Sequence, residues 1–310
     1  MVEMKIFKSF EIPKKYTRSI ILIGNFDGVH LGHQKLLKKA REYKKRLKCK
    51  IGVITFDPSP KMFFNKNLKN FKLMTLNQKI SQFKKEKVDF LINQKFSKNF
   101  SKIKAKLFIN KYLNKKINSQ FIFVSNNFKF GNKREGDIKL LKYYQKNCNY
   151  KVLIPSPLKK NNKIISSTLI RKLLSKGDLL KANQYLSRNW EIEGKIEKGR
   201  KVGRKIGYAT CNVDIGNYVI AKPGVYSVRV KLNHITKKIN GIANLGYRPT
   251  FNQKKILLEV NLFNFNQSIY NHEIRVEFIK FIRSEKKFKN IKQLTNQIKK
   301  DIKVAKRSFN

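Results

Sequence analysis

Acidic residues and cysteines are scarce in this chain of 310 residues. It has 19 Asp and Glu against 71 Lys and Arg, a formal net charge of +52. Cys49, Cys148 and Cys211 form no C-x-x-C pair, so we expect a reducing, cytoplasmic environment and no structural zinc site. Apolar runs long enough to cross a bilayer and a signal-peptide h-region are also missing, so we expect no membrane partner.

The excess positive charge has two interpretations. A strongly basic surface attracts polyanions, and nucleic acid is the usual partner of such a surface. The lysines, however, are spread over the whole chain and accompany abundant Asn, Ile and Phe, residues that share A/T-rich codons. We therefore attribute the charge to drift in genome composition and expect no specific nucleic-acid partner. Salt-sensitive adsorption to polyanions, and attraction of anionic substrates such as ATP, are expected either way.

The most informative segment is GNFDGVHLGH, residues 24–33. It follows an apolar run (20–23) that predicts a buried strand, and it precedes a stretch (34–47) with apolar residues at helical spacing. A glycine-bearing loop at a helix start can hold phosphate, because unpaired N–H groups and the positive dipole end lie there. His30 and His33 can point the same way from the first turn and stabilise charge at a reacting phosphorus. Neither a P-loop nor a G-x-G-x-x-G fingerprint occurs here.

Strands and helices alternate as far as about residue 187, which predicts an open α/β sheet. The expected strands are 20–23, 50–56, 88–93, 120–125 and 150–154, and the expected helices are 34–47, 76–87, 103–113, 138–146, one that continues to Ser175, and 178–186. Ligands of such sheets bind beyond the carboxyl ends of the strands, where the loop at 24–33 lies.

A second anion-binding signal is ISSTLIR, residues 165–171. One hydroxyl residue is enough to cap the helix that follows, so three in a row with an arginine in the first turn point beyond capping. Ser166, Ser167, Thr168 and Arg171 therefore form a second candidate phosphate clamp. Two clamps on one sheet suit a triphosphate.

The remaining residues, 188–310, change from helical to β-type spacing, with tight-turn residues between the segments, which predicts an antiparallel closed barrel. The expected strands are 191–197, 210–213, 225–232, 239–245, 256–263 and 274–281. An amphipathic helix with Ile291, Leu294 and Ile298 on its apolar face ends the chain and is expected to cover the barrel.

Within this half, glycines and basic residues alternate over 199–207, and Gly203, Arg204 and Gly207 could wrap phosphates with backbone amides. Thr210 and Asn212 lie two residues apart, so both oxygens would face one side of a strand and suit nucleotide-bound Mg²⁺. A single carboxylate, Glu259, lies in an otherwise apolar strand. It is either an outward-facing residue or a general base, and the pattern alone does not separate the two.

The chain resembles the prokaryotic bifunctional riboflavin kinase/FAD synthetase family nearly end to end. The motifs that carry the resemblance are GNFDGVHLGH (24–33), FDPSP (56–60), FKFGNKREGD (128–137), ISSTLIR (165–171), GRKIGYATCN (203–212), GVYSV (224–228), GIANLGYRPTF (241–251), LLEVNLF (257–263) and IRSEKKF (282–288). The resemblance implies a Rossmann-like FMN adenylyltransferase domain at 1–187 and a riboflavin kinase barrel at 188–310. It implies riboflavin phosphorylation to FMN, FMN adenylylation to FAD with release of pyrophosphate, and ATP and Mg²⁺ for both.

The resemblance also implies roles for the residues at the matching positions. In the kinase, Glu259 would be the general base, Thr210 and Asn212 would hold Mg²⁺ and ATP phosphates, and the loop 203–207 would cover them. In the adenylyltransferase, the ATP site would comprise Gly24, Asn25, Phe26, Asp27, His30, His33, Ser166, Ser167, Thr168 and Arg171, with His30 and His33 catalytic.

The chain departs from the family's pattern at a few positions. Ala209 replaces a proline and Cys211 an alanine, Asn127 stands where the family has aspartate, and Ser59 where it has histidine. We expect both activities to persist, weakened, in a monomer or weak oligomer.

Three alternatives are open at this stage. One is a single-activity nucleotidylyltransferase of the same superfamily with another acceptor, which the barrel and its candidate residues disfavour. The others are a tRNA-synthetase-like enzyme, which also carries H-x-G-H, and an RNA-binding protein whose charge is its function.

Overall fold

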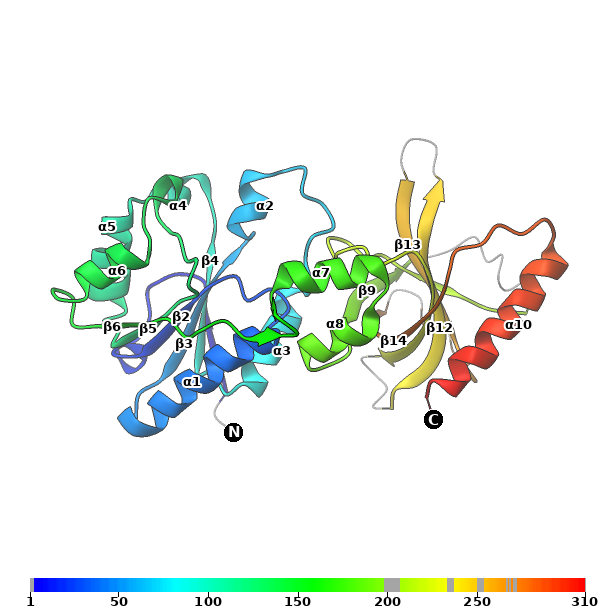
Figure 1. The fold of residues 1–310 in the computed structure, drawn as a ribbon, viewed down its shortest axis with the longest axis horizontal. Coiled ribbons are helices and arrows are strands. Elements are labelled where there is room, and N and C mark those ends of the chain that lie inside the picture. Colours follow the sequence, from blue (N-terminus) through cyan, green and yellow to red (C-terminus); the bar gives the residue numbers. More distant parts are fainter. Residues whose placement is uncertain are drawn as a thin grey trace. The chain divides into compact units, whose positions relative to one another are not determined.

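The computed structural model describes residues 3–197, 207–232, 237–249, 254–265, 267, 269 and 272–309. The chain forms two compact units (Figure 1). The first unit comprises Met1–Lys69 and Leu76–Ser166, and the second comprises Asn70–Thr75 and Ser167–Asn310. Our domain boundary after residue 187 stays a prediction.

The first unit is built on a six-stranded parallel sheet in the order β1-β4-β3-β2-β5-β6. Its strands are β1 (Lys5–Phe7), β2 (Ile20–Ile23), β3 (Ile51–Asp57), β4 (Phe90–Lys95), β5 (Phe121–Phe123) and β6 (Lys151–Leu153). The open α/β sheet expected from the alternating pattern is confirmed. The short edge strand β1 was not predicted, because three residues carry no periodicity.

Helices cover both faces of this sheet, and every residue of β2 is buried. The α-helices are α1 (Leu31–Leu47), α2 (Pro60–Phe64), α3 (Leu76–Lys85), α4 (Lys98–Ser101), α5 (Ala105–Leu107) and α6 (Ile138–Tyr144). The unit also contains the short helices η1 (Lys14–Tyr16) and η3 (Asn132–Arg134) and the π-helical η2 (Phe108–Lys116). A hairpin of β7 (Lys159–Lys160) and β8 (Lys163–Ile164) follows β6. The helix expected over 103–113 is present, as α5 followed directly by the π-helical turns of η2. Ile109 and Leu113 of η2 still fill the core against Ile21 and Ile54.

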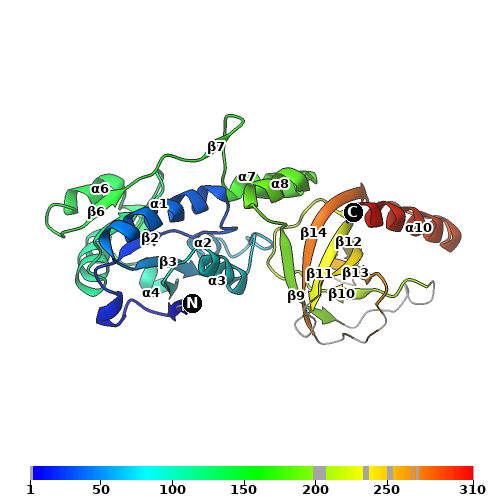
Figure 2. The same cartoon turned by 90° about the horizontal axis from the view of Figure 1, so that it is seen from below.

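The second unit contains the expected antiparallel closed barrel (Figure 2), in the order β10-β13-β12-β11-β14-β9. Its strands are β9 (Glu191–Glu197), β10 (Cys211–Val213), β11 (Gly224–Leu232), β12 (Ile239–Pro249), β13 (Lys254–Leu262) and β14 (Glu273–Ser284), and its helices are α7 (Ser167–Lys176), α8 (Leu179–Leu186) and α10 (Ile291–Arg307). Ala305 of α10 packs on Val225 and Ile242 of the outer barrel surface. The terminal helix therefore covers part of the barrel, as expected.

Residues 70–75, which we call the strap, belong to the second unit although they lie between α2 and α3 in sequence. Val219 N donates a 2.8 Å hydrogen bond to Lys72 O. The buried indole of Trp190 donates from Nε1 to Leu73 O at 3.0 Å. The strap is thus hydrogen-bonded into the unit that carries the barrel.

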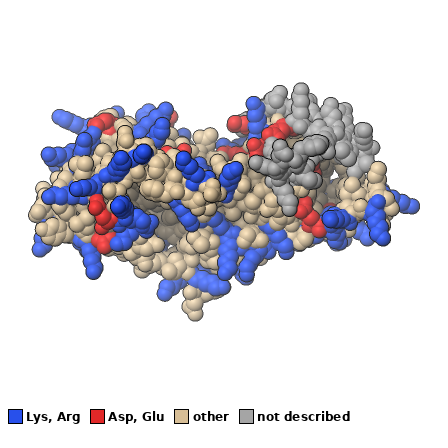
Figure 3. Space-filling view, turned by 90° about the horizontal axis from the view of Figure 1, so that it is seen from above, with Lys and Arg blue, Asp and Glu red and all other residues tan. Residues whose placement is uncertain are grey.

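Lysines and arginines are distributed over the visible surface, with few carboxylates between them (Figure 3). They do not form one stripe there, in agreement with their spread along the sequence. Within the part of the chain that the structure describes, helices are all too short or too polar to cross a membrane.

A buried ion pair joins α10 to the barrel. Arg283 of β14 donates from Nη2 to Asp301 Oδ2 at 2.7 Å and from Nε to both carboxylate oxygens at 2.9–3.0 Å. Gln297 adds a 2.8 Å hydrogen bond to Oδ1, and Asp301 is only 3% exposed. Such an arrangement satisfies the carboxylate completely, so losing its partner leaves a buried charge unpaired.

We expect Arg283→Ala to lower the free energy of unfolding of the second unit by about 3–5 kcal/mol, because Asp301 stays buried without its counter-ion. Urea unfolding followed by the emission of Trp190, the single tryptophan of the chain, measures this change in the correct unit. Lys181→Ala, which breaks the exposed pair with Asp178 in the same unit, is the control and should cost less than about 1 kcal/mol. Equal urea midpoints for the two variants would contradict the expectation.

Candidate active sites in the two units

The loop 24–29 leaves the carboxyl end of β2 at the point where the strand order of the sheet reverses. β2 pairs with β3 on one side and with β5 on the other, and the chain moves outward in both directions from this centre. In open α/β sheets the crevice beyond such a switch point is where ligands bind. The sequence-predicted ATP loop therefore lies where the topology favours a ligand site.

The backbone of this loop is strained. Phe26 has φ +47°, Gly28 +85° and the β-branched Val29 +36°. A non-glycine residue in this region costs about 1–3 kcal/mol, and such residues cluster at functional sites. The ring of Phe26, 2% exposed, holds the loop by packing edge-to-face on Phe83 of α3 at a centroid separation of 5.5 Å.

His30 and His33 lie side by side at the start of α1. Their rings stack with centroids 3.7 Å apart and an interplanar angle of 20°. His30 is the N-cap residue, its O accepts from His33 N and Gln34 N, and it is 5% exposed. Both imidazoles therefore lie at the helix N-terminus, where the positive end of the helix dipole favours an anion.

The second predicted clamp begins next to this helix end. A Cβ added to Gly32 would lie 3.1 Å from both the His30 ring and Ile165 O, so only glycine lets that backbone pass so close. Ile165 is followed by Ser166, the last residue of the first unit. The first turn of α1 and the start of ISSTLIR are therefore neighbours within the first unit.

The other predicted residues of the adenylyltransferase site have these positions. Gly24 N donates to Ile54 O at 3.1 Å, Asn25 is exposed and Asp27 is half-buried. Ser167, Thr168 and Arg171 belong to α7 in the second unit. Arg171 rests there on the strap, with its Nε donating to Phe71 O at 2.7 Å.

Lys79 is a residue that sequence reasoning missed. Its Nζ donates to Asn25 O at 2.7 Å and to Thr55 Oγ1 at 3.4 Å, so α3 ties the ATP loop to the end of β3. One lysine among so many gave no sequence signal, because only the folded sheet brings residues 25, 55 and 79 together.

Lys79→Ala should lower kcat/KM for FAD formation by about ten- to a hundredfold, since a charge-assisted hydrogen bond to the loop is worth about 1.5–3 kcal/mol. The matched control is Lys84→Ala, which removes the same charge from an exposed position of the same helix. FAD released from FMN and ATP is measured by chromatography. Equal losses in both variants would mean that general charge, not the contact to Asn25, is responsible.

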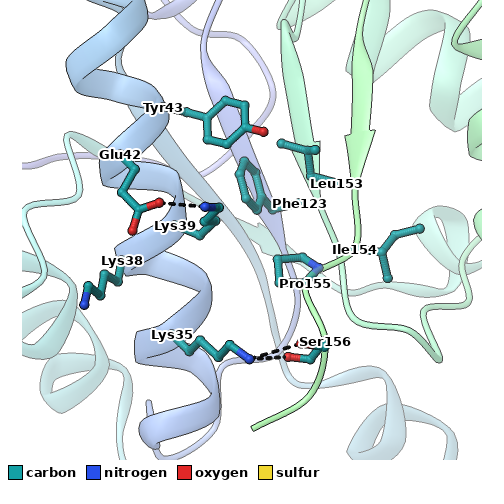
Figure 4. Close-up of a pocket in the computed structure, with 10 residues that line it drawn as sticks. All are labelled: Lys35, Lys38, Lys39, Glu42, Tyr43, Phe123, Leu153, Ile154, Pro155 and Ser156. Carbon is teal, nitrogen blue, oxygen red and sulfur yellow. Dashed lines mark hydrogen bonds and ion pairs between the residues drawn. The ribbon is translucent and has the colours of Figure 1, made fainter.

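A cleft of about 490 Å³ lies along α1 in the first unit (Figure 4). Lys35, Lys38 and Lys39 line it together with a single carboxylate, Glu42, and Lys35 Nζ donates to Ser156 O at 2.9 Å. The cleft follows α1 from Lys35 to Tyr43, beginning one turn after the start of the helix. Its positive charge favours the approach of a polyphosphate to that region.

In the barrel, the strand register places three polar residues at one level. Asn212 of β10 lies opposite Glu259 of β13, and Asn244 of β12 lies opposite Glu259 on its other side. Directly opposed residues face the same side of a sheet. Glu259 and Asn244 are half-buried and Asn212 is 5% exposed, whereas the neighbours Val213 and Leu258, on the opposite face, are completely buried. Glu259 is therefore outward-facing and flanked by two amides, and the two sequence interpretations of this residue are compatible.

Asn244 was not singled out from the sequence. It lies in an alternating strand beside ordinary core residues, and its importance comes only from the pairing of β12 with β13. A strand-register argument needs the partner strand, which the sequence alone does not identify.

Thr210 and Gly207 lie beside this polar row, at a cleft of about 850 Å³. Thr210 is exposed and precedes β10, and Gly207 has φ +83°, which favours glycine. Aromatic Phe263 and Phe265 line the cleft with Lys299 of α10. Gly203 and Arg204 lie outside the described residues.

The donor set on this outer surface fits magnesium. The hydroxyl of Thr210 and the amide oxygen of Asn212 are hard oxygen ligands, and Mg²⁺ retains waters while bridging substrate phosphates. Within the described residues no cluster of three His, Cys, Asp or Glu side chains could hold a metal ion.

Cys211 faces the other way. It pairs with Val260 in the inward-facing row, is 8% exposed, and burial raises the pKa of its thiol to about 12. At pH 8 the thiol is therefore protonated and unreactive. Cys211 and Val260 also line the cleft of about 850 Å³ beside Thr210, so Cys211 contributes packing at the edge of that cleft and no reactive thiolate.

Cys211→Ala should keep kcat and KM of riboflavin phosphorylation within about twofold, because it changes only a small inward-facing side chain. For the same reason, N-ethylmaleimide at pH 8 should not inactivate FMN formation by the unmodified protein. Inactivation that Cys211→Ala prevents would contradict this assignment.

Comparison with known proteins identifies the family of the chain. The family model described as FAD synthetase matches residues 12–169, and the one described as riboflavin kinase matches residues 186–309. The chain belongs to the bifunctional riboflavin kinase/FMN adenylyltransferase family. It is 40% identical to the protein of that name from Buchnera aphidicola subsp. Schizaphis graminum, with 99% of each chain covered. It is 38% identical to that of Haemophilus influenzae, with 94% of each covered.

A solved structure shares the fold over the whole length. It is titled macrolide-efflux protein from Streptococcus pneumoniae, and it superposes with a TM-score of 0.85 at 28% identity, covering 99% of each chain. The likeness supports the two-unit architecture. The efflux activity in that title is a statement about that protein.

Proposed function

We propose that this protein phosphorylates riboflavin with ATP to give FMN, and then adenylylates FMN with a second ATP to give FAD and pyrophosphate. The observation that carries the proposal is the match of both family models in sequence order, together with relatives of that activity over nearly the whole chain. A single-activity nucleotidylyltransferase with another acceptor is not favoured, because the riboflavin kinase model accounts for residues 186–309.

In the kinase, the Glu259 carboxylate takes the proton of the terminal ribityl hydroxyl as its oxygen attacks the γ-phosphorus of ATP, and ADP leaves. Asn212 and Asn244, opposite Glu259 in the two neighbouring strands, hold the reacting groups beside it. Thr210 and Asn212 would hold Mg²⁺, which neutralises charge on the phosphates when bound. The aromatic residues of the neighbouring cleft supply apolar surface for a ring system.

In the adenylyltransferase, an oxygen of the FMN phosphate attacks the α-phosphorus of ATP, and pyrophosphate leaves. The N-terminal N–H groups of α1 and the imidazoles of His30 and His33 stabilise the charge that develops on the phosphate oxygens. Arg171 of α7 is the further residue to which the family resemblance assigns phosphate binding. No group on the protein forms a covalent intermediate, so positioning and charge stabilisation account for catalysis.

Purified protein given riboflavin, ATP and Mg²⁺ should yield FMN and then FAD by chromatography, and EDTA should stop both. His30→Ala should abolish FAD and preserve FMN formation, because its site is in the first unit. Glu259→Gln should abolish FMN formation and preserve FAD formation from added FMN. Each loss is expected to exceed about a hundredfold, the usual contribution of a general base or charge-stabilising group.

The two variants control for each other's folding. If the unmodified protein forms no FMN from riboflavin, the kinase assignment is wrong. If it forms FMN but no FAD, the adenylyltransferase assignment is wrong. If each variant loses both activities, the assignment of the two residues to separate sites fails.

A further inference from the structure

Phe71 of the strap holds Arg171 by two contacts. The Arg171 Cζ lies 3.6 Å from the centroid of the Phe71 ring, and Arg171 Nε donates a 2.7 Å hydrogen bond to Phe71 O. The ring attracts the cation through its quadrupole, and the hydrogen bond fixes the rotation of the guanidinium plane. Both side chains are half-buried, so water competes only partly for these contacts.

The strap itself is fixed on both sides of Phe71. The Asn70 amide donates from Nδ2 to Gly216 O at 2.8 Å, and Lys72 N donates to Asn217 O at 2.9 Å. Phe71 is therefore presented by backbone that the second unit anchors at the preceding and the following residue. A ring held in this way can orient a long, flexible side chain.

We propose that Phe71 is a positioning residue for adenylyl transfer, because it holds the guanidinium of Arg171 in the orientation that binds the ATP phosphates. The inference rests on the proposed function and on the role of Arg171 in it. An arginine that is already ordered loses less rotamer freedom when its ligand binds, so its contribution to affinity is larger. No motif in the sequence points to Phe71, which lies 100 residues before its partner.

The competing explanation is that Phe71 only anchors the strap. Trp190 distinguishes the two, because its indole donates to Leu73 O in the strap and it is the only tryptophan of the chain. Undocking of the strap would change the emission of Trp190 in the flavin-free protein. Loss of the contact between Phe71 and Arg171 alone would leave that emission unchanged.

The test uses the full-length protein with FMN, ATP and Mg²⁺, and it measures FAD by chromatography. Phe71→Ala should lower kcat/KM for ATP by about tenfold, mainly through a higher KM, as expected for a lost cation–π contact. Phe71→Leu, which keeps apolar volume without an aromatic face, should behave like Phe71→Ala, and Phe71→Tyr should restore the activity to within about twofold. FMN formation from riboflavin and Trp190 emission should not change.

The matched control is Phe309→Ala. It removes the ring that faces Arg229 at 5.6 Å, an Arg–Phe contact of the same kind at the C-terminus. With FMN supplied, FAD formation by this variant should match that of the unmodified protein. A tenfold loss here would show that removing any such ring is harmful, and the inference would fail.

A double-mutant comparison decides whether Phe71 acts through Arg171. Arg171→Ala should lose FAD formation, and adding Phe71→Ala to it should cause no further loss. A second tenfold loss in the Arg171→Ala background would overturn the inference. So would a normal KM for ATP in Phe71→Leu while Arg171→Ala is defective, although the proposed function would then still stand. Absence of FAD from the unmodified protein would instead refute the proposed function itself.

Discussion

The burial of β2 on both faces at the centre of a parallel sheet is the constraint on which the first site depends. Its residues, Ile20 to Ile23, are at most 3% exposed, so the strand cannot shift along its neighbours without exposing buried apolar side chains to water. The loop that leaves β2 therefore starts at a fixed point and has only a few residues before α1 begins. The strain at Phe26 and Val29 follows from that short path, and burial of the Phe26 ring offsets it. The N–H groups of α1 and the two stacked imidazoles are placed by the same path.

In the barrel, the register between strands fixes the positions of the candidate site residues. Closing six antiparallel strands fixes which residues are opposite each other, and one row brings Asn212, Glu259 and Asn244 to the outer face. The inward neighbours of these residues are apolar and fully buried, so a slip of one residue would place the carboxylate in the core. The core packing of the barrel thus maintains the position of its candidate base. α10 completes this unit by packing beside that row, held by the ion pair of Arg283 and Asp301.

Local sequence pattern predicted those parts of the structure that local contacts determine. The helical spacing before residue 47, the apolar run of β2 and the alternating segments of the barrel all appear as expected. The family resemblance supplied the roles of His30, Glu259 and Thr210, and these roles remain predictions. What could not be predicted depends on contacts between distant segments. Lys79 contacts Asn25 only because the fold brings α3 next to the loop, and Asn244 lies opposite Glu259 only because β12 pairs with β13. The strap joins the second unit through backbone hydrogen bonds, which do not depend on a side-chain pattern. The helix expected over 103–113 is present, but the sequence did not indicate that most of it is π-helical.

The departures from the family's pattern in the barrel are explained in part by the same non-local contacts. The family has a proline at position 209, which would stiffen the chain just before β10, and this chain has alanine. Asn261 of β13 donates from Nδ2 to Ala209 O at 2.7 Å, so a hydrogen bond from the neighbouring strand restrains the segment instead. Cys211 replaces alanine at an inward position, where its extra volume adds to the barrel core and its thiol stays protonated. Asn212, next to Cys211, lies in the outward-facing row with Glu259. A slip of one residue in β10 would exchange the faces of Cys211 and Asn212, so burial of the side chain at position 211 also keeps the amide at position 212 in its row.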